Sequence, residues 1–344
     1  MIAENGRQIS ILRWFPIAYL FTVAGFQFDG WYHAVVGRDQ FWIAPHFFVI
    51  AGQIAATILA YLFLVRVSEE KKDMRRRAQW FLLVQIIFFI GFAFDQSWHR
   101  IIGQETINTA LVFWGPPHFV IAASLLMTPF LLVRFLRALD EVSRVLLTII
   151  TFGTLLAFVD FYFQPLWPLG PFHVLGVYGE AAMLALLGFV LFWALSYLKG
   201  TPLAASVTTL IALSSIEIMS WGALADTPRV SSVFGTVSAY PFWLTFFSFF
   251  IAAILLDLSN LKKSLSPETK GALWGGVQAG LYFIGAKLWV DLSPHSFYPG
   301  WKAFGGLVIS WHDVLLFTVL GMLGGAIGFL LRSIFQSKFN SKDL

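Results

Sequence analysis

The chain is a succession of long apolar runs separated by short polar connections. Runs long enough to cross a lipid bilayer lie at about residues 12–33, 43–65, 79–99, 112–135, 143–163, 171–197, 203–223, 239–258, 271–291 and 305–331. Because open sheet edges cannot face lipid, each run is expected to form a helix. The pattern therefore predicts an all-α fold, a polytopic transmembrane helix bundle of about ten spans.

The composition excludes an ordinary soluble domain. Hydrophobic residues make up 58% of the chain and charged residues only 12%, and the mean hydropathy is +0.74. A soluble domain carries about 25% charged residues. The main partner of the protein's surface is therefore expected to be the lipid bilayer. The chain has no cysteine, which excludes thiolate metal ligands and leaves His, Asp and Glu.

Basic residues are distributed unequally between the two sides of the predicted bundle. One side carries most of the 23 basic residues, among them the run from Lys71 to Arg77. The opposite side carries Arg38, Arg100, Arg229, Lys287 and Lys302. By the positive-inside rule both termini are expected to be cytoplasmic, in a multi-pass protein of the cell (inner or plasma) membrane. The basic charge is thus assigned to topology, and no nucleic-acid partner is expected.

All seven histidines fall on the side opposite to the basic majority. They are His33, His46, His99, His118, His173, His295 and His312. Polar groups at membrane depth are costly and usually functional. Imidazoles gathered on the predicted extracytoplasmic side therefore indicate that something outside the cytoplasm is handled there.

The stretch that ends the first apolar run and begins the second is the best candidate metal site. Asp29 and His33 are four positions apart, so on a helix they share one face. His46 follows a proline at the start of the next run and can reach the same point. A carboxylate with two imidazoles suits copper, zinc or iron, and copper is the first choice for an outer site without thiols.

A second copy of this arrangement appears two spans later. Asp95, His99 and His118 occupy the corresponding positions, and His118 again directly follows a proline. The first four helices are therefore expected to form two tandem helix-loop-helix units. We predict that residues 1–144 form a duplicated metal-site four-helix unit and that residues 145–344 supply the remaining transmembrane helices of the same bundle.

Charged residues in the connections are candidates for orienting the metal ligands. Arg38 and Asp39 follow the first Asp–His pair, and Glu105 stands ten positions after Asp95, as Asp39 does after Asp29. Groups in this position commonly orient ligating histidines. The simpler interpretation is a surface ion pair of little energetic value.

The first motif resembles the metal-site segment of the C subunit of particulate methane and ammonia monooxygenases. That family has an Asp-x-x-Trp-His motif, an Arg-Asp pair and Asp-x3-His-x12-His spacing. The matching stretch here is Asp29-x3-His33-x4-Arg38-Asp39-x5-Pro45-His46, with Tyr32 in the place of the tryptophan. The resemblance covers about residues 10–135. A second site in the family has Asn where this chain has Asp95, followed by two histidines.

The resemblance implies copper-dependent oxidation of a small apolar substrate by O₂, performed as a subunit of a larger membrane complex. From the residues alone two other functions stay open. One is a copper-handling protein that stores, transports or delivers the ion, and the other is a non-catalytic subunit of a respiratory membrane complex. The remaining outer polar residues fit helix-packing hydrogen bonds better than metal ligation; they are Asp160, His173, Glu180, Glu217, Asp291, His295, His312 and Asp313.

Overall fold

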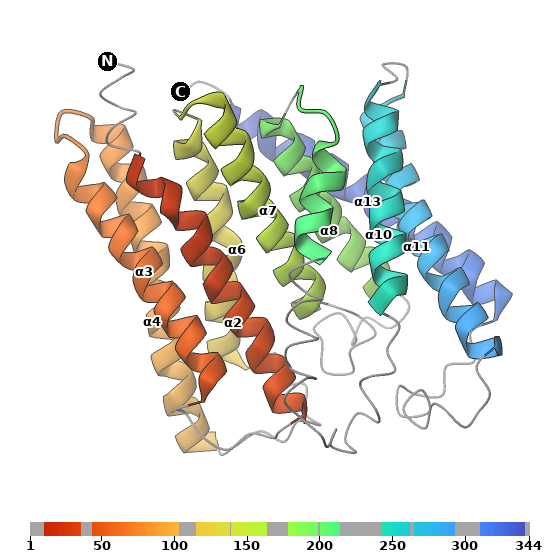
Figure 1. Cartoon of the computed structure of the whole chain (residues 1–344), viewed down its shortest axis with the longest axis horizontal. Helices are drawn as coiled ribbons and strands as arrows, with labels where there is room; N and C mark the ends of the chain where they lie inside the picture. The colour runs from red at the N-terminus through yellow and green to blue at the C-terminus, as the bar shows by residue number, and fades with distance from the viewer. Residues whose placement is uncertain are drawn as a thin grey trace.

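The computed structural model is a bundle of helices that lie side by side (Figure 1). It describes residues 10–35, 43–102, 115–137, 139–163, 178–198, 200–213, 242–261, 265–292 and 310–340. Every helix or strand assigned within these ranges is a helix. The all-α prediction is therefore confirmed for the part of the chain that the structure describes.

The helices follow the predicted apolar runs closely. In chain order they are η1 (Ser10–Trp14), α2 (Phe15–Val35), α3 (Ala44–Arg66), α4 (Lys72–Ile102), α6 (Pro116–Leu136), α7 (Glu141–Phe163), α8 (Gly179–Tyr197), the short helix Ala204–Leu213, α10 (Phe242–Leu261), α11 (Pro267–Leu292) and α13 (Trp311–Asn340). Consecutive helices run in opposite directions (Figure 1).

Six described helices are long and apolar enough to cross a membrane. They are the helices that cover Ser10–Asp29, Ala44–Arg66, Lys72–Trp98, Pro116–Leu136, Glu141–Asp160 and Trp311–Phe335. The other predicted runs hold helices that are shorter or more polar within the described ranges. The helix α4 begins at Lys72, before the predicted residue 79, because the basic residues of this connection are good helix formers and continue the helix beyond its apolar part.

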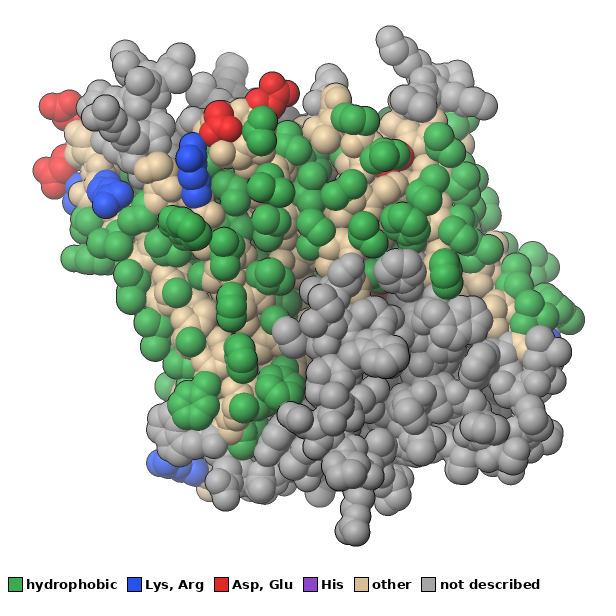
Figure 2. All heavy atoms as spheres, in the orientation of Figure 1, with side chains coloured by type: hydrophobic (Ala, Val, Ile, Leu, Met, Phe, Trp, Pro, Cys, Tyr) green, Lys and Arg blue, Asp and Glu red, His purple; other side chains and the backbone are tan. Residues whose placement is uncertain are grey.

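The outer surface of the bundle carries the apolar side chains expected of a lipid-facing wall. On α3 the exposed positions form one stripe, which comprises Phe47, Ile54, Ile58, Tyr61 and Val65. In Figure 2 hydrophobic side chains cover the middle of the visible described surface, and the charged side chains gather near its edges. A water-facing helix would carry polar residues on this side. The fold is thus compatible with a multi-pass membrane protein.

The first four long helices are held together by side-chain hydrogen bonds in their buried interior. The Gln53 Nε2 donates to Gln85 Oε1 at 3.1 Å, and Gln85 Nε2 donates to Thr128 Oγ1 at 3.0 Å. This network links α3, α4 and α6. The hydroxyl of Tyr19 donates to the carbonyl of Leu125 at 3.0 Å, which links α2 to α6. In an apolar environment such bonds stabilise helix association.

The helices α8, α11 and α13 pack through glycines instead. A Cβ added at Gly275 or Gly325 would collide with backbone of the facing helix, and one at Gly328 would lie 2.5 Å from the Ala185 carbonyl oxygen. The sequence stripe from Gly321 to Gly328 is therefore a surface for close helix packing, as its small residues predict. Here the backbones themselves form the interface.

Candidate metal centre

The first predicted site is assembled where α2 ends and α3 begins. Asp29 lies near the end of α2, and His46 lies in the first turn of α3, directly after Pro45. Proline is tolerated there because the first helical N–H groups have no partner within the helix. The Nε2 atom of His46 lies 3.0 Å from Oδ1 of Asp29, and both side chains are largely buried.

The second predicted site repeats this arrangement between α4 and α6. Asp95 lies near the end of α4, and His118 lies in the first turn of α6, after Pro117. The Nε2 atom of His118 lies 3.2 Å from Oδ1 of Asp95, and these two side chains are also largely buried. Each motif thus places an aspartate near the end of one helix within contact of a histidine in the first turn of a later helix.

A glycine one turn before each aspartate allows the two helices of each unit to approach. A Cβ at Gly25 would lie 2.6 Å from the backbone nitrogen of Val49, and one at Gly91 would lie 2.9 Å from Cγ1 of Ile121. Val49 and Ile121 each stand three positions after the histidine of their unit. The same register therefore brings each aspartate to its histidine.

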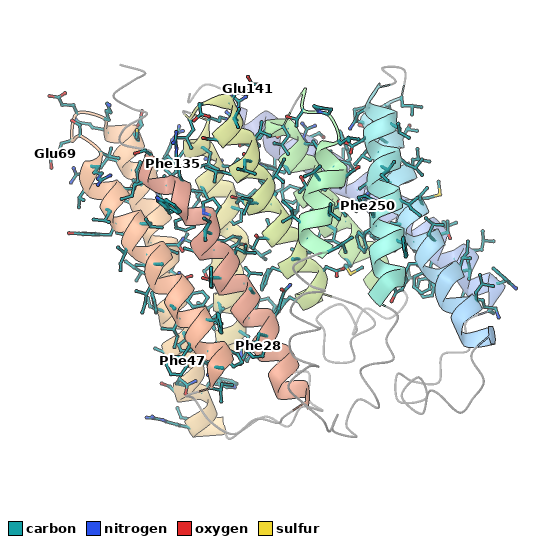
Figure 3. The ribbon with its side chains drawn as sticks, viewed as in Figure 1. Phe28, Phe47, Glu69, Phe135, Glu141 and Phe250 are labelled. Atoms are coloured by element: carbon teal, nitrogen blue, oxygen red, sulfur yellow. The ribbon has the colours of Figure 1, made fainter. Side chains whose placement is uncertain are left out.

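The two pairs lie at the same end of the bundle and on neighbouring helices. The ring of Phe92, three residues before Asp95 in α4, meets the imidazole of His46 edge to face, with a centroid distance of 6.1 Å. Phe28 and Phe47, the chain neighbours of Asp29 and His46, are labelled at this end in Figure 3, and Glu69 and Glu141 lie at the other. An aromatic ring of α4 thus lies against the histidine of the first pair.

The Nε2–Oδ1 distances within the two pairs suit two ligand atoms of one metal ion. Metal–nitrogen and metal–oxygen bonds of about 2.0–2.2 Å place neighbouring ligands about 3 Å apart, as the pairs have them. A direct hydrogen bond between the two side chains gives the same separation. Among the described side chains no three His, Asp or Glu residues gather to hold a metal. The predicted third ligands, His33 and His99, have side chains outside the described part.

Most of the other candidate residues lie outside the part of the chain that the structure describes. Arg38, Asp39 and Glu105 lie outside the described residues, and so do His173, Glu217 and His295, while the side chain of Glu180 is likewise not described. His312 is exposed in the first turn of α13. The structure thus brings together Asp29 with His46 and Asp95 with His118, and it describes no contact of the remaining candidates with these pairs.

A buried carboxylate lies on α7 at the same end of the bundle. Asp160 is only 9% exposed, and its Oδ1 has no hydrogen-bond partner among the described residues. One turn earlier, the carbonyl of Ala157 accepts a hydrogen bond from Gln27 Nε2 at 3.2 Å, which ties α7 to α2 beside the first pair. His173, the next histidine along the chain, lies outside the described residues.

Two features of this region escape the motif analysis. The glycines at 25 and 91 have a readable signal, since each stands four positions before the aspartate of its repeat. The glutamines at 53 and 85 have a weaker one, as isolated amides within apolar runs.

Comparison with protein-family models, with curated proteins and with solved structures returns no match to this chain.

Proposed function

We propose that this chain is a membrane-embedded metal protein that holds copper at its two Asp–His pairs. The observation that carries the proposal is the duplication of one pair, with the same preceding glycine and the same proline before the histidine. An Asp–His contact that only stabilised the fold would not require the same glycine and proline positions in both units. In each unit the histidine four positions after the aspartate, His33 or His99, is the proposed third ligand, because on a helix it shares the aspartate's face. Zinc and iron are the alternatives by ligand chemistry.

We further propose that the chain is a subunit of a membrane oxidoreductase that oxidises a small apolar substrate with O₂. The resemblance of the first motif to the C subunit of copper membrane monooxygenases supports this reaction class. Bound copper would supply the activation of O₂. The chain's own contribution is an apolar enclosure, since Phe92 lies against His46 and Phe28 packs on Phe48 at a centroid distance of 6.2 Å. Such walls admit an apolar substrate and limit water.

The orientation follows from the charge distribution. We propose that both termini are cytoplasmic and that the Asp–His pairs face the extracytoplasmic side, with other membrane subunits as partners. The chain has no cysteine, so single cysteines introduced by Lys72→Cys and His312→Cys are specific reporters. An impermeant thiol reagent added to intact cells is expected to label position 312 and not position 72. Labelling at position 72 alone contradicts the orientation.

The metal is tested by elemental analysis of the full chain purified from native membranes. We expect about two equivalents of copper in the wild type. Loss of a ligand weakens metal binding at least about 10–100-fold, so His46→Ala and His118→Ala should each remove about one equivalent. His312→Ala is the matched control, because it removes an exposed imidazole at the start of another helix.

The outcomes separate the proposals. Wild-type protein from metal-replete cells that holds no stoichiometric transition metal contradicts the metal site. Equal loss in all three variants contradicts the ligand assignment. The purified complex could instead hold stoichiometric copper that exchanges freely and supports no O₂-dependent oxidation. That result contradicts the proposed oxidoreductase and favours the copper-handling alternative.

A further inference from the structure

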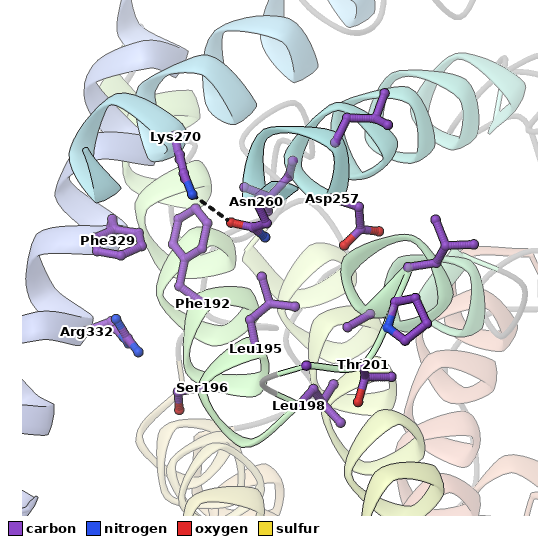
Figure 4. A pocket seen from close by; sticks show the side chains of 16 residues that line it. Phe192, Leu195, Ser196, Leu198, Thr201, Asp257, Asn260, Lys270, Phe329 and Arg332 are labelled. Carbon is purple, nitrogen blue, oxygen red and sulfur yellow. Dashed lines mark hydrogen bonds between the residues drawn. The ribbon is translucent and has the colours of Figure 1, made fainter. Parts of the chain in front are cut away.

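A cavity of about 680 Å³ lies at the end of the bundle opposite to the Asp–His pairs (Figure 4). The ends of α8, α10 and α13 and the start of α11 enclose it. Its walls are largely apolar, with Phe192, Leu195, Leu256 and Phe329 among the lining side chains. Two cations also line it, Lys270 from α11 and Arg332 from α13. The cavity thus joins an apolar wall to a positive charge.

The two cations are not neutralised by any described carboxylate. Lys270 Nζ donates a hydrogen bond to Asn260 Oδ1 at 3.2 Å, which leaves its charge intact. Arg332 lies over the ring of Phe329 at 5.4 Å, and its buried Nε has no hydrogen-bond partner among the described residues. The side chain of Arg332 as a whole is only partly buried, so its terminal guanidinium nitrogens stay available to an anionic ligand.

Asp257, the one acidic side chain among the described lining residues, is already engaged. The carboxylate of Asp257 accepts hydrogen bonds from the backbone N–H groups of Ala205 and Ser206 at 3.0 and 2.9 Å, and from the Ser206 hydroxyl at 2.6 Å. These bonds cap the start of the short helix Ala204–Leu213, whose positive end opposes the charge. The carboxylate therefore stabilises the cavity wall and does not pair with the cations.

We infer that this cavity binds the phosphate headgroup of an anionic phospholipid. Arg332 and Lys270 match a phosphate in charge and in donor geometry, and Phe192, Leu195 and Phe329 offer an apolar surface to the upper part of an acyl chain. The cavity lies at the end of the bundle that carries the basic connections, where the positive-inside rule puts the cytoplasmic leaflet. Basic pockets between helices at this leaflet bind anionic lipid headgroups. A free phosphate would use the cations and leave the apolar wall unused.

The test uses the full chain, purified and delipidated in a neutral detergent. Binding of phosphatidylglycerol and of phosphatidylcholine is measured by native mass spectrometry and by the shift in melting temperature. We expect phosphatidylglycerol to bind and to raise the melting temperature, and phosphatidylcholine to do neither. Loss of one charge-assisted hydrogen bond weakens binding by about tenfold, so Arg332→Gln and Lys270→Gln should each weaken phosphatidylglycerol binding by about that factor.

The matched control is Arg76→Gln, which removes an exposed cation in the first turns of α4, at the same end of the bundle. It is expected to leave the affinity unchanged. Three results overturn the inference: equal binding of both lipids, an equal loss in the control variant, or inorganic phosphate that competes with the lipid at millimolar concentration. The last result assigns the cavity to a free phosphate. If Arg332→Gln does not fold, Lys270→Gln at the half-buried start of α11 still decides the test.

Discussion

The two halves of this bundle hold their helices together by different means. In the four-helix unit of α2, α3, α4 and α6, buried amides and hydroxyls connect the helices, and polar pairs close one end. In the group of α8, α11 and α13, glycines let the backbones touch, and the polar groups gather at the opposite end. Polar contacts tolerate small shifts because side chains reorient, whereas backbone contacts do not. The two halves should therefore respond differently to small substitutions.

The largest effect is expected where backbones meet. Gly275→Ala places a methyl group against the Gly321 carbonyl, and such overpacking costs about 3 kcal/mol when the backbone must move. Gly280→Ala on the same helix is the matched control, since its Cβ would meet no backbone and would lie 3.2 Å from the Thr318 hydroxyl oxygen, a contact that a small shift relieves. Thermal unfolding in detergent should show a large loss for the first variant and a small change for the second. Similar losses would mean that the glycine contact does not determine the packing of α11 and α13.

A smaller effect is expected at the glycine beside the first Asp–His pair. Gly25→Ala meets the backbone of Val49, whereas Gly91→Ala in the second unit meets a flexible isoleucine side chain. We expect a destabilisation of about 2 kcal/mol in the first unit and less than about 1 kcal/mol in the second. Thermal unfolding of the two variants compares equivalent glycine positions in the two repeats. A larger loss for Gly91→Ala would contradict the shared register.

The amide network is expected to matter less. Gln85→Ala removes the side chain that links Gln53 to Thr128 and leaves the Gln53 amide with only its 3.3 Å hydrogen bond to the backbone carbonyl of residue 85. Interhelical hydrogen bonds in membranes contribute about 0.6 kcal/mol on average and up to about 1.7 kcal/mol, so a loss of about 1–2 kcal/mol is expected. Gln79→Ala, at an exposed position of the same helix, is the control and should change the stability little. Chemical denaturation in mixed micelles can resolve the difference.

The sequence predicts the helices well because a membrane span needs both length and apolarity. It also predicts the two Asp–His pairs, since a repeated motif on consecutive hairpins must return to the same end of the bundle. The cavity near Arg332 could not be predicted in this way. Its residues come from five separate helices and the connection after α8, and in the sequence Lys270 and Arg332 indicate only the topology. Which cation stays unpaired depends on tertiary packing, as the engagement of Asp257 shows.

The smallest effect is expected at the contact that joins η1 to the start of α7. Arg13 Nη2 lies 2.9 Å from Oδ2 of Asp140, and both side chains are about half exposed. The Asp140 carboxylate also accepts a hydrogen bond from the backbone N–H of Ser143 at 2.9 Å and so caps α7. Hydrogen bonds from Ser143, with the charge of Arg13 as a smaller cause, hold the pKa of Asp140 below its usual value. The ionised carboxylate therefore favours folding more than the protonated carboxyl group does.

The sign of the pH dependence follows from this lowered pKa. The stabilisation is complete above the pKa of an unfolded aspartate, about 3.9, and is lost as the pH falls through the lower folded pKa. Asp140→Asn keeps a capping oxygen and removes the charge, whereas Asp140→Ala removes both. At neutral pH we expect the melting temperature to fall slightly in the asparagine variant and further in the alanine variant. As the pH falls below about 4, the wild type should approach the asparagine variant, while the alanine variant stays below both. A wild-type advantage over asparagine that is constant with pH would show that the Arg13 contact and the charged cap do not contribute to stability.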